Sequence, residues 1–347
     1  TGFKVNAVYG GRAGSKDRME IKHRPAVLVG TPGRVADHLR REAFDTAFIQ
    51  SLVLDEFDKS LEIGFEGEMR DILHALPDVG RKILTSATQG EEIPRFVGLK
   101  SPQVLDFLED KISQLQVKKV LSPTKDKLET LGQLLGQLGS KNGIIFCNFK
   151  DSIQRVSDYL SDHDISHGVF SGGMEQIDRE RSLIKFRNGT YPLLLATDLA
   201  ARGIDVPELD FIIHYHLPLR AEEFIHRNGR TARMNSEGTA YILQYEKEPL
   251  PDFVGRPALE KLLPSTLPAP SAWSTLLISG GRKDKISKGD IAGFFLKQGG
   301  IQSDALGAIE LKTDCAFVAV KSVVLEQLLS KVNNQKLKEK KVRISLI

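Results

Sequence analysis

Leu52-Val53-Leu54-Asp55-Glu56-Phe57-Asp58 is an apolar run that ends abruptly in three carboxylates. Short apolar runs with β-branched residues are typical of buried parallel strands, and the ligands of open α/β sheets gather at the carboxyl ends of such strands. Crowded carboxylates commonly hold a cation or take part in proton transfer. The stretch therefore predicts Mg²⁺ binding and activation of a water, although a solvated acidic turn explains it equally well in isolation.

The composition is typical of a globular protein with two or three domains. The chain has 347 residues, of which 41% are hydrophobic and 27% are charged, and domains commonly hold roughly 100–200 residues. No apolar run approaches the ~20 residues needed to cross a bilayer, so we expect no membrane insertion. Cys147 and Cys315 lie far apart and outside any Cys-x-x-Cys pattern, which indicates reduced thiols and a cytoplasmic location.

Positive charge is concentrated at the carboxyl-terminal end. Residues 273–347 hold 13 Lys and Arg against 7 Asp and Glu, whereas the whole chain has a net charge of only +3. A polyanion would therefore bind first at this end.

The amino-terminal residues, Thr1-Gly2-Phe3-Lys4, resemble neither a signal peptide nor a native start. They lack an initiator Met and lead at once into a strand-like segment and the turn Gly10-Gly11. We therefore expect the sequence to begin inside a domain.

Strand-like and helix-like segments alternate over residues 1–112, which we assign to a first domain. The expected strands lie near Lys4–Val8, Ala26–Val29, Ser51–Leu54 and Lys82–Thr85, with helical periodicity at Arg34–Glu42 and Gly67–Leu76. Such alternation is typical of βαβ units in a parallel, doubly wound sheet. A polar stretch without a strong pattern, residues 109–114, sets the boundary.

The same alternation returns over residues 113–246, the second expected domain. Strands are expected at Asn142–Cys147, His167–Phe170, Pro192–Ala196 and Phe211–Tyr215, and helices at Ser152–Ser161 and Glu175–Phe186. Another parallel sheet is the simplest explanation.

Residues 247–272 contain six of the fifteen prolines, a density that predicts a stiff, extended linker. The last block, 273–347, has the order strand, helix, strand, strand, helix, strand. Its segments are Thr275–Ser279, Gly289–Gln298, Ala308–Lys312, Cys315–Lys321, Val323–Val332 and Lys341–Leu346. This is the ferredoxin-like α+β arrangement that RNA-recognition modules use.

Three polar segments follow expected strands or helices. Ser86-Ala87-Thr88 offers two hydroxyls that either bond the acidic group or cap the next turn. Ala196–Asp205 combines a cation, a glycine and two acids, and its Asp205 is placed to accept a ribose hydroxyl, unless the loop merely holds a salt bridge. His226–Arg233 has three arginines at three-residue spacing, so on a helical turn Arg230 and Arg233 would share a face toward a phosphate. A solvated basic helix face is the alternative.

Together these segments resemble the DEAD-box RNA helicases. The motifs appear in the family's order: Gly10-Gly11, Thr31-Pro32-Gly33-Arg34, Asp55-Glu56-Phe57-Asp58, Ser86-Ala87-Thr88, Ile144-Ile145-Phe146-Cys147-Asn148, Gln176-Ile177-Asp178-Arg179, Ala196–Asp205 and His226–Arg233. The resemblance implies two tandem RecA-like parallel-sheet domains, the first incomplete, followed by a ferredoxin-like (RRM-like) domain.

The resemblance also implies ATP and Mg²⁺ as cofactors. Asp55 would act through Mg²⁺, and Glu56 would orient or deprotonate the attacking water. Arg230 and Arg233 would reach the γ-phosphate. Further nucleotide contacts would come from Asp58, Ser86, Thr88, Gly203 and Asp205.

RNA backbone contacts are implied for both domains, and such contacts give affinity without sequence choice. The implied residues are Gly11, Thr31, Gly33, Arg34, Arg179, Thr197 and Arg202.

The chain departs from the family pattern at two points. Phe57 replaces the family's Ala, a change we expect to be tolerated if Phe57 packs into the sheet. No Gly-Lys dipeptide occurs anywhere, so the G-x-x-x-x-G-K-[ST] phosphate loop and the glutamine motif before it are missing. Both would precede residue 1, which favours an amino-terminally truncated helicase.

Residues 273–347 resemble the RNA-binding domain of DbpA-type bacterial helicases, which anchors those proteins on structured ribosomal RNA. The segment Cys315–Val320 offers a single aromatic, whereas ordinary RNA-recognition sheets stack bases on two or three. We therefore expect binding through a basic edge made of Arg282, Lys283, Lys285 and the 336–343 cluster, unless that cluster is only a solvated helix end.

The function that follows is an ATP-dependent RNA helicase that unwinds short duplexes in ribosome assembly as a cytoplasmic monomer. A non-enzymatic RNA-binding or scaffold protein with a degenerate helicase core is the alternative.

Overall fold

A computed structural model gives the structure of the chain. It describes residues 2–11, 13–62, 64–76, 79–86, 93–99, 101–106, 115–198, 206, 209–232 and 237–347, without the side chains of Lys59 and Glu62. The chain divides into two compact units, Thr1–Ile112 and Ser113–Ile347.

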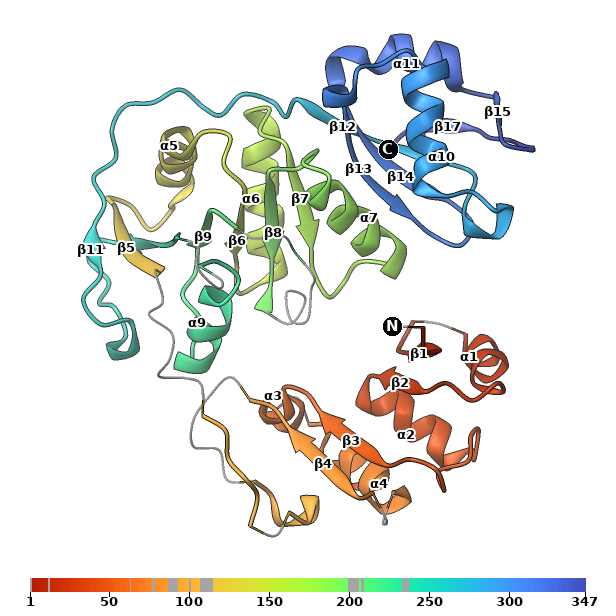
Figure 1. Ribbon diagram of the computed structural model, residues 1–347. Coiled ribbons are helices and arrows are strands. Elements are labelled where there is room, and N and C mark those ends of the chain that lie inside the picture. The colour runs from red at the N-terminus through yellow and green to blue at the C-terminus, as the bar shows by residue number, and fades with distance from the viewer. Residues whose placement is uncertain are drawn as a thin grey trace. The chain divides into compact units, whose positions relative to one another are not determined.

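The first unit contains two parallel strand pairs with helices between them (Figure 1). Strand β1 (Val5–Val8) pairs with β2 (Val27–Gly30), and β3 (Ser51–Leu54) pairs with β4 (Arg81–Leu84). The helices are α1 (Gly14–Ile21), α2 (Pro32–Arg40), α3 (Phe57–Glu62) and α4 (Glu66–Ala75). Among the described residues the two pairs do not join into the single parallel sheet that was expected. Alternation of strands and helices identifies the strands but does not say which strands are neighbours.

Helices α2 and α4 supply the small core of this unit. Ala36, Ile72 and Leu76 are buried together, and Leu52 of β3 packs against them. The apolar Val53 and Ile83 on the other side of β3 and β4 are exposed. This core therefore holds the strand pair β3 and β4 from one side.

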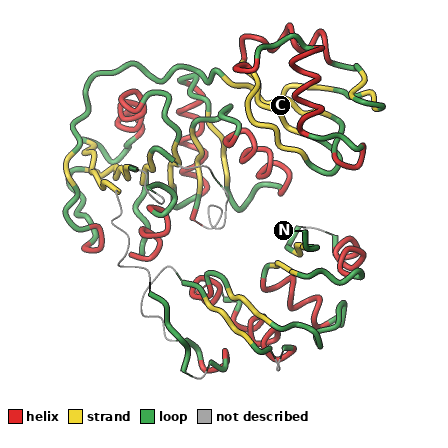
Figure 2. Tube along the Cα trace, viewed as in Figure 1, coloured by secondary structure: helices red, strands yellow, loops and turns green. Residues whose placement is uncertain are grey.

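The second unit is built on a seven-stranded, fully parallel sheet in the order β11-β5-β10-β9-β6-β8-β7. Figure 2 draws the strands in yellow. The strands are β5 (Leu115–Ser122), β6 (Gly143–Phe146), β7 (His167–Phe170), β8 (Leu193–Ala196), β9 (Phe211–His214), β10 (Gly238–Tyr245) and β11 (Ala258–Leu259). The helices are α5 (Leu128–Leu138), α6 (Lys150–Asp162), α7 (Gln176–Arg187) and α9 (Ala221–Asn228).

Both faces of the central strands are buried, as alternate residues join different cores. Ile145 and Leu195 lie in the cluster that α5 and α6 complete, whereas Ile144 and Leu194 lie in the cluster with Phe186 of α7. Strands buried on both faces read as continuous apolar runs, which is why the sequence locates them so well.

The proline-rich segment is not a free spacer. Ala258 and Leu259 form the edge strand β11 beside β5, and Glu260 forms an ion pair of 2.8 Å with Lys118. Proline is tolerated next to edge strands because their outer N–H groups need no partner in the ladder. The segment therefore extends the sheet of the second unit.

The last block forms a four-stranded antiparallel sheet in the order β13-β14-β12-β17. Its elements are β12 (Trp273–Ile278), α10 (Lys288–Gly293) with a π-helical turn (Phe294–Gln298), β13 (Leu306–Leu311), β14 (Ala316–Lys321), α11 (Leu325–Val332), the hairpin β15 (Lys336–Leu337) and β16 (Lys340–Lys341), and β17 (Ile344–Leu346). Leu276, Val318 and Leu328 lie in the core beneath the helices. The parallel sheet and this ferredoxin-like sheet confirm the predicted fold class.

Candidate active site and RNA-facing residues

The acidic turn of the first unit lies where β3 ends, and a threonine from the neighbouring strand holds it. Thr85, directly after β4, donates its hydroxyl to Asp55 Oδ1 at 2.5 Å. The same hydroxyl accepts a hydrogen bond of 3.2 Å from the backbone N–H of Glu56. Asp55 remains exposed and Glu56 is half-buried. One hydroxyl therefore positions both carboxylate residues at the sheet edge.

The backbone of Glu56 is itself unusual. Its φ of +47° lies in the left-handed region, which non-glycine residues rarely adopt. The hydrogen bond at Glu56 N and another from Phe57 N to the Thr85 carbonyl, 3.2 Å, fix this turn. Such backbone outliers concentrate at functional sites. The left-handed conformation at Glu56 therefore supports a functional role for the turn between β3 and α3.

Phe57 and Asp58 turn inward at the start of α3. Phe57 is buried, in keeping with the expectation that a bulky side chain packs into the unit, and Asp58 is only 1% exposed. The sequence placed Asp58 with the nucleotide-binding residues. Its proposed contact with the nucleotide stays a prediction, made by a side chain that is buried in this structure.

The hydroxyl partner of the acidic turn is Thr85, which was expected as the last residue of the strand Lys82–Thr85. Strand β4 ends at Leu84, so the Thr85 side chain is available at the edge. Ser86 is exposed, and Thr88 lies outside the described residues. The signal for Thr85 was present in the run of hydroxyl residues that follows the strand.

Arg34, a predicted RNA contact, is held by a buried carboxylate. Its Nε donates to Asp17 Oδ2 at 2.8 Å, and the same oxygen lies 3.3 Å from His38 Nε2. Asp17 and His38 are fully buried, whereas the Arg34 side chain keeps partial exposure. The pairing fixes the guanidinium at the start of α2.

Three further predicted RNA contacts lie on the surface or near it. Thr31 is the exposed residue before α2, and Gly11 has a φ of +80°. Gly33 is the second residue of α2, and a methyl group there would meet only Phe65 Cε1, at 3.9 Å. Packing within the described residues therefore does not require glycine at position 33.

Arg227 ties together the carboxyl ends of three strands in the second unit. Its guanidinium bonds both oxygens of Asp198 after β8 (2.6 and 2.5 Å), Asn148 Oδ1 after β6 (2.8 Å) and the His216 carbonyl after β9 (2.6 Å). Arg227 is 2% exposed and its guanidinium lies 5.0 Å from the ring of Phe146. The first arginine of the His226–Arg233 motif is therefore a scaffold residue.

The titratable groups around this clamp have strongly shifted pKa values. Burial, reinforced by the charge of Arg227, lowers the pKa of His214 to about 3, and burial with the charges of Lys127 and Arg227 lowers the pKa of His216 to about 4. Burial raises the pKa of Cys147 to about 12. Each of these three groups is therefore neutral at neutral pH, and its side chain packs in the interior without a charge.

The other predicted residues of the second unit are only partly described. Helix α9 ends at Asn228, so the shared helix face expected for Arg230 and Arg233 does not extend to Arg230, which lies in the turn beyond the helix. Arg233, and with it Arg202, Gly203 and Asp205, lies outside the described residues.

Arg179 lies on α7, and Thr197 directly follows β8. Thr197 is half-buried. The Nε of Arg179 is shielded from solvent and makes no hydrogen bond to any described residue. A buried unpaired donor costs about 1–3 kcal/mol, which an anionic ligand could recover.

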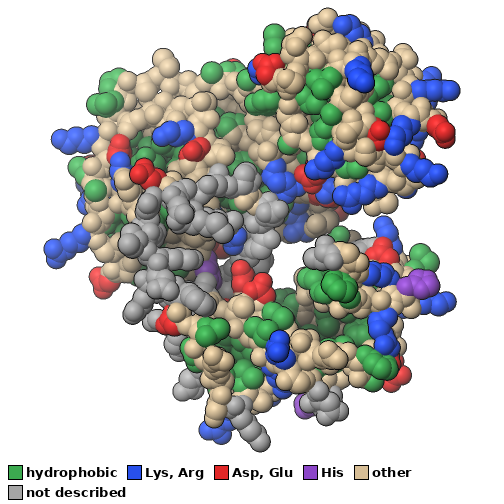
Figure 3. Space-filling model, in the orientation of Figure 1, with side chains coloured by type: hydrophobic (Ala, Val, Ile, Leu, Met, Phe, Trp, Pro, Cys, Tyr) green, Lys and Arg blue, Asp and Glu red, His purple; other side chains and the backbone are tan. Residues whose placement is uncertain are grey.

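The basic edge of the carboxyl-terminal module is solvent-exposed, and Lys and Arg side chains gather on its visible face (Figure 3). Lys338 and Lys340 pair with Asp290 and Asp284, each at 2.8 Å. Lys336 and Lys341 face each other across the β15–β16 hairpin, and like charges placed opposite one another repel. The exposed residues of this edge without an ion pair to any described residue are Arg282, Lys283, Lys285, Lys336, Lys341 and Arg343.

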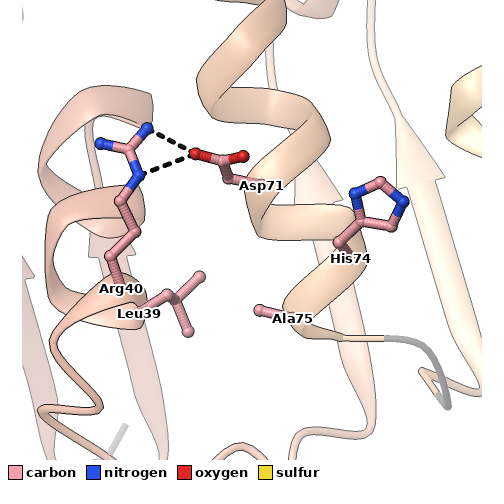
Figure 4. Close-up of a pocket in the computed structure, with 5 residues that line it drawn as sticks. All are labelled: Leu39, Arg40, Asp71, His74 and Ala75. Atoms are coloured by element: carbon pink, nitrogen blue, oxygen red, sulfur yellow. Dashed lines mark hydrogen bonds and ion pairs between the residues drawn. The ribbon is translucent and has the colours of Figure 1, made fainter.

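A surface hollow lies between α2 and α4, and none of the predicted site residues lines it. It is lined by Leu39, Arg40, Asp71, His74 and Ala75 (Figure 4). Arg40 donates from Nε to Asp71 at 2.8 Å, and that hydrogen bond is the main reason why the pKa of Arg40 is raised. An exposed ion pair supplies neither a nucleophile nor a phosphate cradle.

Within the described residues no cluster of three or more His, Cys, Asp and Glu could hold a metal ion. Among the same residues, no helix has the length and apolar character to span a membrane.

Comparison with known proteins identifies three family regions. Residues 1–96 match the DEAD/DEAH box helicase family, residues 126–235 the helicase conserved C-terminal domain, and residues 275–346 the DbpA RNA binding domain.

Two curated proteins match almost the whole chain in sequence. The ATP-dependent RNA helicase DbpA of Escherichia coli is 30% identical over 99% of this chain and 78% of its own length, and that of Bacillus subtilis is 28% identical over 99% and 79%. The structure of Saccharomyces cerevisiae Dbp5 bound to RNA and ADP BeF3 has a TM-score of 0.61 at 24% identity, over 71% of this chain and 65% of that one. The chain therefore belongs to the DEAD-box ATP-dependent RNA helicases of the DbpA type.

Proposed function

We propose that this protein hydrolyses ATP with Mg²⁺ and unwinds short RNA duplexes during ribosome assembly, as a cytoplasmic monomer anchored on structured ribosomal RNA. The observation that carries the proposal is the edge at which Thr85 holds Asp55 and positions the Glu56 backbone, in a chain of this family. ATP use follows from the names of the relatives.

The acidic edge suits a magnesium ion. Asp55 is exposed; its Oδ1 accepts the Thr85 hydroxyl, while Oδ2 makes no hydrogen bond to a described residue. Mg²⁺ is commonly held by one or two carboxylates together with water and substrate phosphates, so Asp55 would hold it. When bound, the ion would neutralise charge on the phosphates.

The protein's own groups would perform the remaining tasks. Glu56, fixed by its backbone bond to Thr85, would accept a proton from the attacking water. Arg230 and Arg233 would stabilise the developing charge on the γ-phosphate. Asp58, Ser86, Thr88, Gly203 and Asp205 remain the candidates for holding the nucleotide.

RNA would be held through its backbone by both helicase domains. Arg34 is positioned by Asp17, and Arg179 has a shielded Nε without a partner among the described residues. Thr31, Gly11, Gly33, Thr197 and Arg202 complete the proposed contacts. Backbone contacts carry no sequence information, so sequence preference would come from the carboxyl-terminal module.

Replacing Glu56 by Gln tests the catalytic assignment. Residues 1–347 contain no Gly-Lys dipeptide, so ATP hydrolysis is measured in a protein that carries a phosphate-binding loop ahead of residue 1. We expect kcat to fall by about 10²–10⁴, the range for a lost general base, while ATP-dependent RNA binding persists. The matched control is Glu66→Gln, which removes an exposed carboxylate paired with Arg70. Loss of RNA binding together with hydrolysis would mean that Glu56 is structural.

The double change Lys336→Ala and Lys341→Ala tests the basic edge. We expect weaker binding of a structured ribosomal RNA hairpin and a shallower dependence of log K on log salt, by roughly 0.7–0.9 for each phosphate that the variant no longer neutralises. The control is Lys297→Ala with Lys331→Ala, which removes the same charge elsewhere in the module. Equal losses in both double variants would refute a localised RNA edge.

A further inference from the structure

The first residues of the proline-rich segment fold back onto the second unit. After β10 the chain forms a 3₁₀ turn, Asp252–Val254, which is preceded by Pro251 with a φ of −60° and followed by Gly255 with a φ of +71°. Proline fixes φ near this value, and glycine adopts a positive φ without strain. The turn therefore has a defined shape, and we call residues 250–254 the brace.

The brace packs against helix α9. Val254 is buried in a cluster with Phe224 of α9 and Ile242 of β10, and Leu250 and Phe253 pack against the same cluster. The ring centroids of Phe253 and Phe224 lie 5.8 Å apart, a separation typical of favourable aromatic pairs. Phe224 is only 7% exposed. The apolar side chains of the brace therefore help to bury the side chain by which α9 joins this cluster.

A histidine of β9 connects Phe224 to the last residue of α9. The ring centroids of Phe224 and His214 lie 4.8 Å apart, and His214 Nε2 lies 2.9 Å from Asn228 Oδ1. His214 is neutral at neutral pH because burial lowers its pKa to about 3, so its Nε2–H donates to the amide oxygen. Both His214 and Asn228 are buried. Ring packing and one hydrogen bond thus join the brace to the end of α9.

The turn that carries Arg230 is built directly on this end of the helix. The Arg230 N–H donates to the Arg227 carbonyl, and the Thr231 N–H donates to the Asn228 carbonyl, each at 3.1 Å. The Thr231 hydroxyl also donates to the Leu209 carbonyl. The position of α9 therefore determines where the backbone of Arg230 lies.

The brace and the Arg227 side chain hold α9 at different points. Arg227 bonds groups that follow β6, β8 and β9, whereas the brace contacts Phe224, which lies three residues earlier on the helix. A helix of eight residues is too short to be stable without tertiary packing. Contacts at two points resist rotation of such a helix as well as its displacement.

We propose that the brace positions the arginine motif for ATP hydrolysis: by holding α9 through Phe224, it sets where Arg230 is presented to the γ-phosphate. The catalytic consequence rests on the proposed function, in which Arg230 stabilises the charge that develops there. A misplacement of about 1 Å can lower a rate on the order of 10²-fold. A small shift of α9 would therefore be visible in kcat.

Phe253→Ala tests the catalytic consequence in a protein that carries a phosphate-binding loop ahead of residue 1. We expect kcat to fall about tenfold or more. The KM for ATP should stay within about twofold, because a contact made only in the transition state does not alter substrate binding. Phe253→Tyr, which keeps the aromatic ring, should restore kcat.

The matched control is Leu263→Ala, which removes an apolar side chain from the same proline-rich segment. Leu263 is 67% exposed and lies outside the cluster around Phe224, so kcat should not change. A Phe253→Ala variant whose kcat stayed within about twofold of the unchanged protein would overturn the proposal.

Combining Phe253→Ala with Arg230→Ala separates positioning of the arginine from general damage to the fold. Loss of Arg230 alone should cost about 10³–10⁵-fold in kcat, measured in a single turnover. If the brace acts through Arg230, adding Phe253→Ala should lower this residual rate by less than about twofold, since the two effects are not additive. The same tenfold fall in both backgrounds would overturn the positioning role.

Hydrogen exchange in residues 1–347 tests the brace without ATP. Phe253→Ala should speed exchange of the Arg230 and Thr231 amides by about fivefold or more, because exchange reports local opening. The Leu131 amide, bonded to the Lys127 carbonyl at 2.8 Å in α5, should be unaffected. Unchanged exchange at Arg230 would overturn the brace. If the unchanged parent hydrolysed no ATP, the proposed function would fail, while exchange at Arg230 would still decide whether the brace holds α9.

Discussion

The carboxyl ends of the strands carry polar motifs in both units, but the two edges differ in how many hydrogen-bonding groups stay available to a ligand. In the second unit Arg227 uses four hydrogen bonds within the protein and is buried. In the first unit Asp55 is exposed and shares one hydroxyl with the Glu56 backbone. A guanidinium has five N–H groups, so Arg227 has little capacity for a ligand. The Arg227 edge is a scaffold, whereas the Asp55 edge faces solvent.

Removing Arg227 should produce the largest loss of stability. Arg227→Met leaves Asp198 as an uncompensated, mostly buried carboxylate, and breaking a buried pair in this way costs about 3–5 kcal/mol. Urea unfolding followed by Trp273 emission measures the second unit, which contains the only tryptophan.

The control for Arg227 is Arg155→Met, which removes an exposed partner of Asp126 and should cost at most about 1 kcal/mol. If the Arg227 variant lost no more stability than this control, the scaffold interpretation would be wrong.

Acidification should weaken the second unit in a predictable range. His214 and His216 have folded pKa values of about 3 and about 4, depressed first by burial, against the ordinary histidine pKa of 6.5. The unfolded chain therefore binds protons below pH 6.5 that the folded chain does not bind, so the free energy of unfolding falls as the pH drops from 6.5 toward 4.

Urea midpoints from Trp273 emission, taken between pH 7.5 and 5, measure this trend before most carboxylates titrate. His216→Gln should reduce the slope. A free energy of unfolding that stayed constant or rose over this range would contradict the burial of neutral histidines at the scaffold edge.

The sequence located most strands of the second unit because apolar runs mark strands that are covered on both faces. His167–Phe170 was predicted with its observed bounds, and Pro192–Ala196 differs from β8 by one residue. Strands β5 and β10 were missed, and at β5 Lys118 and Lys119 interrupt the apolar pattern. The structure compensates Lys118 with Glu260 of the segment after β11, a pairing between residues far apart in sequence.

The roles of the motif arginines could not be read from their spacing. Arg227 and Arg230 belong to the same three-residue repeat, but Arg227 lies on α9 and Arg230 lies beyond its end. Whether one of these arginines is buried depends on which strand ends surround its side chain. The order of the strands in the sheet decides this, and the spacing of the arginines does not reveal that order. Thr85 was overlooked for a related reason, since its importance comes from a partner on the neighbouring strand.

The smallest expected effect is that of Gly33→Ala, which tests whether glycine at the start of α2 is needed for the fold or for RNA binding. Gly33→Ala should stabilise α2 by up to about 1 kcal/mol, because alanine is the better helix former and the added methyl meets only Phe65, at 3.9 Å. If RNA approaches Gly33 closely, the same methyl should weaken RNA binding several-fold. Hydrogen exchange of the α2 amides and RNA titration measure the two quantities.

Gly67→Ala is the matched control for Gly33→Ala, since Gly67 is the second residue of α4 and a methyl there meets nothing within 4 Å. It should stabilise its helix equally and leave RNA affinity unchanged. A Gly33 variant that is more stable but binds RNA less well would show that glycine at this position serves the ligand rather than the fold. Equal RNA affinity in both variants would remove Gly33 from the RNA-facing surface and leave Arg34, held by Asp17, as the contact to examine at the start of α2.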